Sequence, residues 1–339
     1  MKAVIFGCDG HQVSESERHF FSTHNPVGFI LFGRNIETPS QVQSLVETLK
    51  SCVDHHKPLI LIDQEGGRVA RLRPPHWPAY PTAATFGSLD AANGAAGEEA
   101  VMLNARLIAD DLFQLGINVN CAPVLDILYD GAADIIGDRA YGANVETIAR
   151  LGRKVCEGLL SGGVLPVIKH IPGHGRAGVD SHLELPVVDT GLDTLRQTDF
   201  AAFRAVADAP LAMTAHVIYS DIDPDNPATV SKSVIADIVR GDIGFDGFLM
   251  SDDLSMKALA GTIRDRTVAA IAAGCDVVLH CNGDMEEMTA VSDVCPPLSS
   301  RSTERLESAL VALTAPGKLD RSCTMNKLKL LMESAAQRV

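Results

Sequence analysis

The sequence predicts an α/β fold, a single-domain (β/α)₈ TIM barrel, and two observations support this prediction. Eight short apolar runs alternate with longer segments of helical period, which is the pattern of a parallel barrel wrapped by helices. Aromatic residues make up only 5% of the chain. Small and branched apolar residues dominate instead, as expected for strands that are buried on both faces.

The apolar runs and the segments between them give the expected order of elements. We expect strands over residues 3–7, 28–32, 59–63, 119–123, 165–170, 211–216, 247–251 and 276–281. We expect helices between them, with the clearest periodicity over residues 41–52, 99–115, 148–160, 195–207 and 267–273. This alternation repeats eight times within one chain, so it predicts a complete barrel.

The chain beyond about residue 300 is expected to close the fold with helices. In the last helix, apolar residues recur at helical spacing and form one face: Leu328, Leu331, Met332 and Ala335. No Pro/Gly/Ser-rich linker and no low-complexity tract interrupts the sequence. We therefore expect residues 1–339 to form one domain, a length that single α/β barrels commonly reach.

Charge and composition narrow the classes of partner. The net charge of −14 and the lack of a basic stripe argue against nucleic acid and anionic membrane surfaces. The N-terminal apolar run is too short for a signal peptide, and no stretch approaches the roughly 20 apolar residues of a membrane span. The eight cysteines include no Cys-x-x-Cys pair and are expected to be reduced, mostly buried thiols. We expect a cytoplasmic protein without an obligate protein partner.

Polar side chains gather where the predicted strands end. Asp63 ends the third strand, Lys169 and His170 end the fifth, His216 ends the sixth, and Asp252 ends the seventh. The carboxyl ends of barrel strands form one face, where TIM-barrel enzymes place their catalytic groups. Charged groups near buried strand ends cost free energy unless they are paired or used. We therefore predict an active site on this face.

The residue types narrow the chemistry of that site. His170 and His174 have the spacing of metal ligands, but Pro172 and Gly173 between them disfavour the helix that would align the two imidazoles. We therefore predict no metal and no cofactor. The absence of a Gly-x-Ser-x-Gly elbow argues against a serine hydrolase. Carboxylates, imidazoles and cations remain, and this set suits the cleavage of a glycosidic bond.

Three motifs stand out in the sequence. Residues 169–175 read Lys-His-Ile-Pro-Gly-His-Gly, and Asp-Ser-His follows at 180–182. Residues 63–71 read Asp-Gln-Glu-Gly-Gly-Arg-Val-Ala-Arg, and residues 251–256 read Ser-Asp-Asp-Leu-Ser-Met. Together they closely resemble the bacterial β-N-acetylglucosaminidases of glycoside hydrolase family 3, and the similarity covers nearly the whole chain. The chain lacks the second α/β domain of larger relatives, which fits the single-domain branch.

The resemblance implies a set of catalytic residues. Asp252 matches the nucleophile that forms a covalent glycosyl-enzyme, and His182 matches an unusual general acid/base whose partner is Asp180. A rigid strand end aims a carboxylate well, and a carboxylate beside an imidazole fixes its tautomer. The competing interpretation of Asp252 is a helix N-cap for a segment from Leu254, and the adjacent Asp253 is the rival nucleophile.

The resemblance also implies a set of residues that hold an N-acetylglucosamine unit. These are Asp63, Arg71, Arg139, Lys169 and His170, with His216 lining the same pocket. Charged donors make the stronger hydrogen bonds to sugar hydroxyls and to an acetamide carbonyl. For Arg71 the alternative is a surface salt bridge.

The loop that carries the Asp180–His182 pair is rich in glycine. Glycines between residues 173 and 179 predict that the loop from Gly173 to Glu184 swings in over bound sugar. Residues 176–179 read Arg-Ala-Gly-Val, where family members often carry Asp or Asn and then Thr. We therefore expect the details of this loop to differ from those of its relatives.

The predicted function is the retaining hydrolysis of terminal, non-reducing β-N-acetylglucosamine. The resemblance points to cell-wall fragments, in which this sugar is linked to 1,6-anhydro-N-acetylmuramic acid with or without peptide. Three alternatives remain open at this point: phosphorolysis on the same fold, a Schiff-base lyase that uses Lys169, and a catalytically silent sugar-binding protein.

Overall fold

The centre of the computed structural model, which describes residues 1–131, 135–179 and 184–336, is a closed barrel of parallel strands. The strands are β1 (Lys2–Gly7), β2 (Pro26–Leu31), β3 (Leu59–Ile62), β6 (Val119–Asn120), β7 (Leu165–Ile171), β9 (Leu211–Thr214), β11 (Phe248–Asp253) and β12 (Val277–His280). Each pairs with the next barrel strand along the chain, and β12 closes the ring on β1. The predicted fold class is confirmed.

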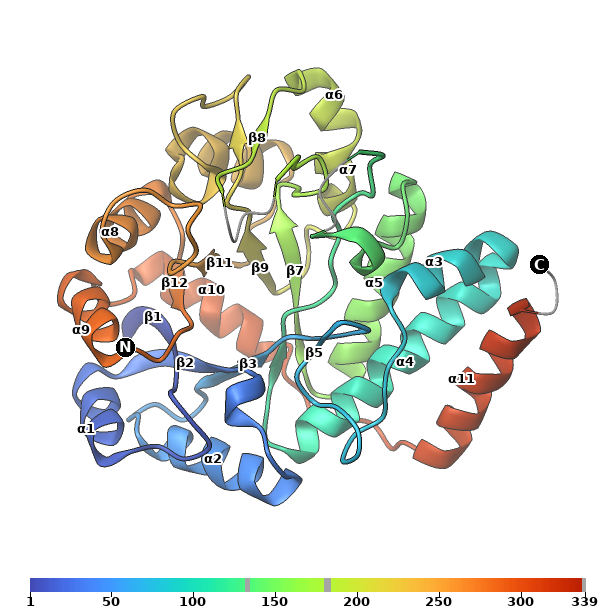
Figure 1. The fold of residues 1–339 in the computed structure, drawn as a ribbon, viewed down its shortest axis with the longest axis horizontal. Helices are drawn as coiled ribbons and strands as arrows, with labels where there is room; N and C mark the ends of the chain where they lie inside the picture. The colour runs from blue at the N-terminus through green and yellow to red at the C-terminus, as the bar shows by residue number, and fades with distance from the viewer. Residues whose placement is uncertain (132–134, 180–183, 337–339) are drawn as a thin grey trace.

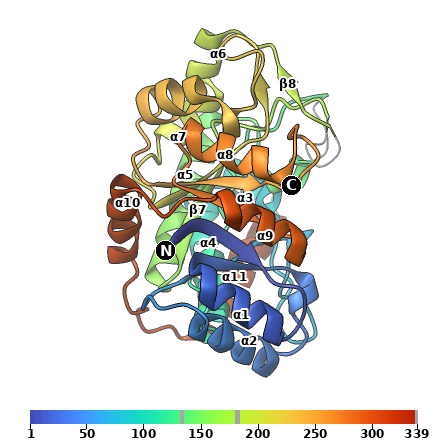
Figure 2. The same cartoon turned by 90° about the vertical axis from the view of Figure 1, so that its left-hand side faces the viewer.

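Helices surround the barrel on its outer side (Figures 1 and 2). They are α1 (Glu15–His24), α2 (Pro39–Ser51), α3 (Ala83–Ala92), α4 (Gly94–Gln114), α5 (Val145–Ser161), α6 (Leu192–Gln197), α7 (Asp199–Arg204), the π-helix η4 (Val234–Asp242), α8 (Ile263–Ala273), α9 (Met285–Val294), α10 (Ser300–Val311) and α11 (Arg321–Ala336). The last helix, α11, packs against α4 at the outer edge of the molecule (Figure 1).

The strands are apolar along their length because both of their faces are buried. In β3, Leu61 belongs to the cluster inside the barrel, whereas Ile60 and Ile62 belong to the cluster between the barrel and the helices. The same alternation places Met213 of β9 inside and Ala212 outside. A run of apolar residues without polar alternation is the expected signature of such strands.

Two predicted elements differ from the observed ones. The helix expected over 195–207 is two short helices, α6 and α7, because Thr198 between them has φ −118° and ψ −93°, outside the helical region. The strand expected over 119–123 ends at Asn120, and Pro123 beyond it has no amide to donate to a ladder. The other boundaries moved by a few residues.

Short elements at the carboxyl end of the barrel carry several site residues. The antiparallel strands β4 (Gln64–Gly66) and β5 (Val69–Ala70) follow β3 as a small hairpin. The 3₁₀ turn η2 (Gly137–Arg139) follows β6, and the turn η3 (Ala228–Val230) follows β9. Outside the barrel, β8 (Val187–Val188) pairs in parallel with β10 (Ile218–Tyr219).

Two compositional predictions concern the whole chain. In the described part of the chain, no helix combines the length and the apolarity needed to cross a bilayer. The cysteines are free thiols, and all of them except Cys323 are buried, as predicted.

Candidate active site

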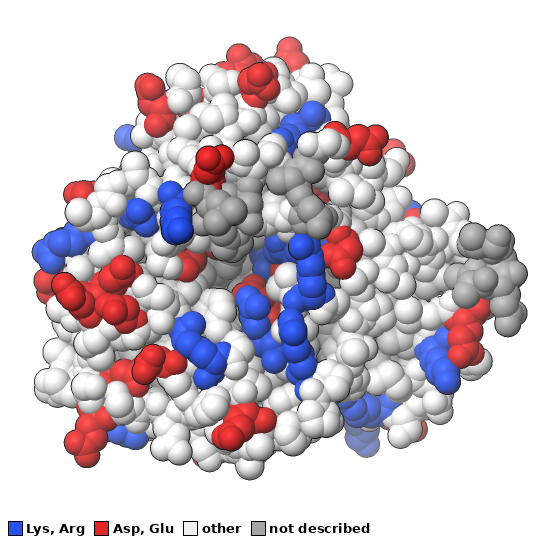
Figure 3. Space-filling model, viewed as in Figure 1, with Lys and Arg blue, Asp and Glu red and all other residues white. Residues whose placement is uncertain are grey.

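A cavity of about 280 Å³ opens at the carboxyl ends of the barrel strands. Figure 3 shows a hollow near the centre of this face, with Lys and Arg side chains gathered beside it. Most of the predicted site residues line the cavity: Asp63, Arg71, Arg139, Lys169, His170 and Asp252. An apolar part of the wall includes Phe32, Ile136, Met213 and Met256. Its volume lies near the lower end for small-molecule pockets, roughly 300 Å³, which suits a single sugar ring.

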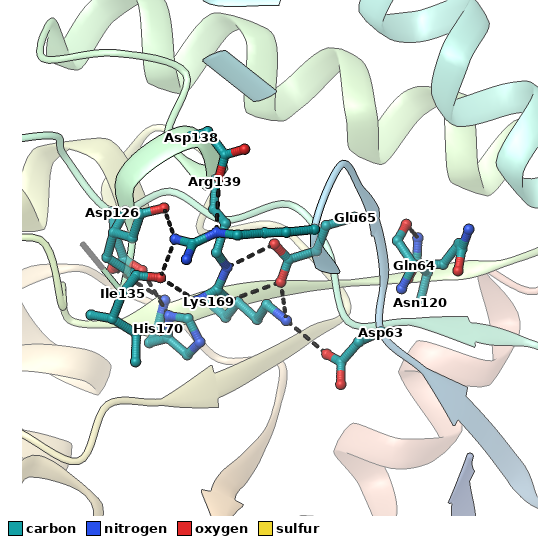
Figure 4. A network of polar contacts seen from close by, with 12 residues as sticks. Asp63, Gln64, Glu65, Asn120, Asp126, Ile135, Asp138, Arg139, Lys169 and His170 are labelled. Atoms are coloured by element: carbon teal, nitrogen blue, oxygen red, sulfur yellow. Dashed lines mark hydrogen bonds and ion pairs between the residues drawn. The ribbon is translucent and has the colours of Figure 1, made fainter. Parts of the chain in front are cut away.

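Five charged side chains form a cluster beside the cavity, and we call it the charge cluster: Asp63, Glu65, Arg71, Arg139 and Lys169. All of them except Glu65 line the cavity. Lys169 Nζ lies 2.9 Å from Asp63 Oδ1 and 2.7 Å from Glu65 Oε1. Arg139 makes a bidentate pair with Glu65, with both N–O distances 2.9 Å (Figure 4). Arg71 Nη2 donates to Asp63 Oδ2 at 3.0 Å. Each cation therefore has a carboxylate, and Lys169 has two.

The charge cluster holds its members in their ionised forms. Burial alone would raise the pKa of Asp63, but the Lys169 ammonium and the Arg71 guanidinium hold it well below its usual range. Burial opposes ionisation of Glu65 as well, yet Lys169 and Arg139 lower its pKa to about 2. The pKa of Lys169 is raised by the two carboxylates in spite of burial. A Schiff-base nucleophile needs a neutral amine, so this environment argues against the lyase alternative.

Glu65 is a member of this cluster to which sequence reasoning assigned no role. It lies on β4, two residues after Asp63, within the motif at residues 63–71. Its side chain is 8% exposed, which is unusual for a glutamate that is not paired or used. The spacing of two between Asp63 and Glu65 could have indicated this role, since residues two apart in an extended segment point to the same face.

Asp252 stands at the end of β11 and has a different environment. Its Oδ1 accepts a hydrogen bond from the Asp253 amide at 2.8 Å, and within the described residues no Lys or Arg forms an ion pair with it. Burial would raise its pKa, but the nearby His170, the Asp253 amide and the Lys169 ammonium hold the pKa below its usual value. The carboxylate is therefore ionised, faces the cavity and keeps an oxygen available.

The structure argues against both alternatives for Asp252, which are a helix N-cap role and Asp253 as the nucleophile. A helix N-cap is excluded, because the next helix, α8, begins only at Ile263 and Thr262 caps it. The rival carboxylate, Asp253, is occupied by backbone: its Oδ1 accepts from the amides of Ser255 and Cys281, both at 3.1 Å. Its Oδ2 accepts from the Ser255 hydroxyl at 2.5 Å. Asp253 thus fixes the turn after β11.

His170 is oriented by a buried carboxylate that sequence reasoning missed. Its Nδ1 lies 2.7 Å from Asp126 Oδ2, and the ring lines the cavity. Asp126 is 1% exposed, and its other oxygen accepts from the His174 amide at 2.6 Å. Burial opposes the charge of Asp126, but His170 and His174 keep its pKa below the usual value. A carboxylate at Nδ1 leaves Nε2 of His170 for a ligand.

His216 does not line the cavity, contrary to the prediction. Its ring is fully buried, with Nδ1 2.7 Å from the Thr229 hydroxyl and Nε2 3.0 Å from the carbonyl oxygen of Asp253. Both ring nitrogens are therefore used inside the protein. From the sequence, a histidine at a strand end is equally compatible with a ligand contact and with hydrogen bonds inside the protein. The sequence therefore contained no sign that the His216 ring is buried.

The first part of the glycine-rich loop is packed rather than free. A side chain at Gly173 would lie 2.9 Å from Asp199 Cβ, and one at Gly175 would lie 2.0 Å from the Ile127 carbonyl oxygen. These two glycines are needed for close approach and not for hinge motion. His174 and Ala177 are also buried. In this structure residues 173–177 are packed against the body of the protein, and the swing of residues 173–184 stays a prediction.

Arg176 ties the loop to the body of the protein. Its Nε donates to Asp199 Oδ2 at 2.7 Å, and its Nη2 donates to the Tyr129 hydroxyl at 2.7 Å. The guanidinium also stacks on the Tyr129 ring, 3.9 Å from its centroid. The predicted acid/base pair, Asp180 and His182, lies outside the described residues, a few positions beyond this anchor.

A barrel enzyme with an ionised strand-end carboxylate, a neighbouring cluster of fixed charges and a cavity for one sugar ring has the equipment of a glycoside hydrolase. Comparison with known proteins agrees and makes the class specific. The family model described as "Glycosyl hydrolase family 3 N terminal domain" matches residues 2–313. The chain belongs to glycoside hydrolase family 3, and the resemblance drawn from its motifs is confirmed.

Its relatives are β-hexosaminidases. The β-hexosaminidase of Alkalilimnicola ehrlichii is 38% identical over 286 residues, which are 82% of this chain and 80% of the relative. That of Idiomarina loihiensis is 32% identical over 93% of this chain and 94% of its own. The chain groups with the β-hexosaminidases of the family, as its motifs predicted.

Solved structures of the family superpose on the whole barrel. NagZ from Neisseria gonorrhoeae, in complex with N-trifluoroacetyl-D-glucosamine, gives a TM-score of 0.85 at 30% identity and covers 99% of this chain and 98% of its own. A family 3 β-N-acetylglucosaminidase from Paenibacillus sp. gives 0.87 at 32% identity, over 99% of this chain and 67% of its own.

Proposed function

We propose that this protein is a retaining exo-β-N-acetylglucosaminidase, which removes terminal, non-reducing β-linked N-acetylglucosamine. The observation that carries the proposal is Asp252, an ionised carboxylate on the cavity wall that forms no ion pair with Lys or Arg in the described part of the chain. The sugar is supported by kinship, since the relatives are β-hexosaminidases and the Neisseria protein binds a glucosamine derivative.

The reaction proceeds in two displacements. Asp252 attacks the anomeric carbon while the bond to the leaving oxygen breaks, and that oxygen takes a proton from His182. In the second step His182 accepts a proton from water, the water oxygen attacks the anomeric carbon, and the bond to Asp252 breaks. Asp180 favours the protonated imidazole and fixes its tautomer. Two inversions at the same carbon give net retention.

The charge cluster and His170 hold the sugar. An ammonium has three donors, and two of those of Lys169 face Asp63 and Glu65, so one remains for a sugar oxygen. Arg71 and Arg139 offer further fixed donors along the same wall. The aim of these groups is set before the substrate arrives, because their carboxylate partners already fix them.

The proposed natural substrates are cell-wall fragments, N-acetylglucosamine linked to 1,6-anhydro-N-acetylmuramic acid with or without peptide, handled in the cytoplasm. This step rests on kinship. The gathering of Lys and Arg beside the hollow, on a chain with net charge −14, is compatible with it, since a muramoyl aglycone carries a carboxylate (Figure 3).

Phosphorolysis is less favoured than hydrolysis by the charges at the cavity. A phosphate that replaces water needs cations with unspent charge, but Arg71, Arg139 and Lys169 each pair with a carboxylate. Product analysis with and without phosphate separates the two reactions, since only phosphorolysis yields the sugar 1-phosphate.

The proposal is tested with an aryl β-N-acetylglucosaminide and the wild type, Asp252→Ala and His182→Ala proteins. We expect phenol release by the wild type without phosphate and none by Asp252→Ala. His182→Ala should lose less activity on aglycones that are good leaving groups, because these need less help from an acid. If the wild type releases nothing with or without phosphate, the hydrolase proposal is wrong.

A further inference from the structure

A line of buried side chains runs beneath Asp252, between strands β9 and β11. It consists of Thr214 at the end of β9, His216 two residues later, and Thr229 in the turn η3. All three side chains have an exposed fraction of 0%. None of them lines the cavity, so a contact with substrate does not explain them.

Short contacts connect these side chains in sequence. The Asp252 amide lies 3.3 Å from Thr214 Oγ1, and Thr214 Oγ1 lies 2.7 Å from Thr229 Oγ1. Thr229 Oγ1 lies 2.7 Å from His216 Nδ1. His216 Nε2 then lies 3.0 Å from the carbonyl oxygen of Asp253. The line therefore begins at the backbone amide of Asp252 and ends at the backbone carbonyl of the next residue, Asp253.

The direction of the hydrogen bonds follows from one fixed point. His216 Nε2 faces a carbonyl oxygen, which only accepts, so Nε2 carries the hydrogen. In the neutral ring Nδ1 is then bare and accepts from the Thr229 hydroxyl. Thr229 in turn accepts from Thr214, and Thr214 accepts from the Asp252 amide. In this arrangement each hydroxyl accepts once and donates once, and the Thr229 hydroxyl gives its single hydrogen to His216 Nδ1.

Burial supports the neutral ring that this direction requires. The pKa of His216 is lowered, first by its removal from water, although Asp252 and the Asp253 carbonyl act in the opposite sense. The Thr229 hydroxyl is also within donating distance of the Ala215 carbonyl oxygen, at 3.1 Å, so that carbonyl competes with the closer imidazole nitrogen, at 2.7 Å, for its single hydrogen.

We propose that Thr214, Thr229 and His216 form a clamp, which holds the backbone on both sides of Asp252 and thereby sets the position of its carboxylate for attack on the sugar. The proposal rests on the proposed role of Asp252 as nucleophile. The three residues are positioning residues, since they touch the backbone of the nucleophile and not the substrate. A displacement of about 1 Å at a reacting group costs up to roughly 10²-fold in rate.

The clamp predicts a separation between chemistry and binding. The charge cluster, which holds the sugar, lies on other strands, so loosening the clamp should slow formation of the glycosyl-enzyme and leave sugar affinity intact. The substitution Thr229→Val removes the central hydroxyl with little change of shape, and Thr229→Ser restores it. Thr267→Val is a matched control: Thr267 is equally buried, but its hydroxyl bonds to the Ile263 carbonyl within α8.

The test uses two measurements on each protein. A 5-fluorinated N-acetylglucosaminyl fluoride, whose ring fluorine slows both steps and whose fluoride leaves readily, reports the rate of glycosyl-enzyme formation. Titration with N-acetylglucosamine reports reversible binding. We expect Thr229→Val to lower the rate about 10- to 100-fold with Kd changed less than about twofold. Thr229→Ser and Thr267→Val should stay close to the wild type.

Other outcomes overturn the clamp. If Thr229→Val and Thr267→Val have equal rates, or if rate and affinity fall together in Thr229→Val, the clamp does not act through Asp252. Should Thr229→Val fail to fold, Thr214→Val and Thr214→Ser apply the same comparison at the first link. A doubly protonated His216 in ¹⁵N NMR at neutral pH would contradict the direction of the line.

Failure of the proposed function has a different signature. In that case the wild type itself forms no glycosyl-enzyme with the fluorinated sugar, whatever the state of the clamp.

Discussion

Two acidic residues follow strand β3 and two end strand β11, and the protein surrounds the two pairs differently. After β3, Asp63 at the cavity and Glu65 behind it are joined to three cations. At β11, Asp252 faces the cavity without such a partner in the described structure, and Asp253 is bonded to backbone amides. Asp63 and Glu65 are committed to fixed cations and Asp253 to backbone amides and a hydroxyl, whereas Asp252 keeps an oxygen without such a partner in the described structure.

Charge state alone does not distinguish Asp63 from Asp252. The pKa of each lies below its usual value in spite of burial, the first through Lys169 and Arg71 and the second through groups that include His170, the Asp253 amide and Lys169. The difference lies in the occupation of the carboxylate oxygens. Roles in a site with several carboxylates are therefore assigned from their partners and not from residue type.

The largest expected effect is on kcat, and it distinguishes the two carboxylates of β11, Asp252 and Asp253. Asp252→Asn should lower kcat on the order of 10⁴-fold or more, because an amide cannot form the glycosyl-enzyme. Asp253→Asn should lower kcat by less than about 10²-fold, since its amide oxygen still accepts from the Cys281 amide. Steady-state kinetics on an aryl glycoside compare the two. A greater loss in Asp253→Asn would reverse the assignment.

The pair at β3 is expected to matter for stability. Glu65→Gln leaves Arg139, 11% exposed, without its bidentate anion, so the free energy of unfolding should fall by about 3–5 kcal/mol. The control is Asp208→Asn, which breaks the exposed pair with Arg153 and should cost about 1 kcal/mol or less. Urea denaturation measures both. Equal losses of unfolding free energy in the two variants would show that the Glu65–Arg139 ion pair contributes no more than an exposed one.

The pH dependence of stability is a second test of the ion pairing of Glu65. Glu65 has a pKa of about 2 in the fold against an ordinary 4.5. A lowered folded-state pKa stabilises the fold fully above the ordinary value, and this contribution is lost as the pH falls from about 4.5 toward 2. Over that range the wild type should lose stability more steeply than Glu65→Gln. Parallel curves of denaturation midpoint against pH would argue against a paired Glu65.

The smallest expected effect concerns the loop that precedes the proposed acid/base. Arg176→Met removes the anchor to Asp199 and Tyr129, and it should lower kcat/KM roughly tenfold for poor leaving groups, a part of what general acid catalysis supplies. Good leaving groups should be affected less. Arg176→Lys keeps an ion pair with Asp199 and should recover part of the loss. An equal loss for both classes of leaving group would assign Arg176 to general stability.

The sequence predicted the barrel because its strands carry a strong local signal, unbroken apolar runs separated by helical periods. It also predicted which strand ends face the cavity, since the geometry of a parallel barrel brings all carboxyl ends to one face. Asp63, Lys169, His170 and Asp252 lie there for this reason, whereas Arg71 reaches the cavity from the end of β5, outside the barrel. Resemblance, and not periodicity, assigned their roles.

The sequence could not predict which side chains from distant segments contact one another. Asp126 lies in an apolar stretch, and nothing local indicates that its carboxylate meets His170, 44 positions away. His216 was expected in the pocket because it follows a strand end. Its sequence neighbours do not indicate the direction of its ring, which points into the protein interior. The glycines of the loop predict motion, but at positions 173 and 175 glycine is also required by close neighbours that only the fold brings near.

The proposed function depends most directly on the identity of the nucleophile, and trapping the covalent intermediate identifies that residue. Wild-type protein is incubated with the 5-fluorinated N-acetylglucosaminyl fluoride, digested with protease at low pH, and mapped by mass spectrometry. We predict one added fluorinated sugar per chain, attached to Asp252. Attachment to Asp253 or Glu65 would contradict the comparison of the two strand ends, and an unlabelled protein that still hydrolyses aryl glycosides would exclude a glycosyl-enzyme.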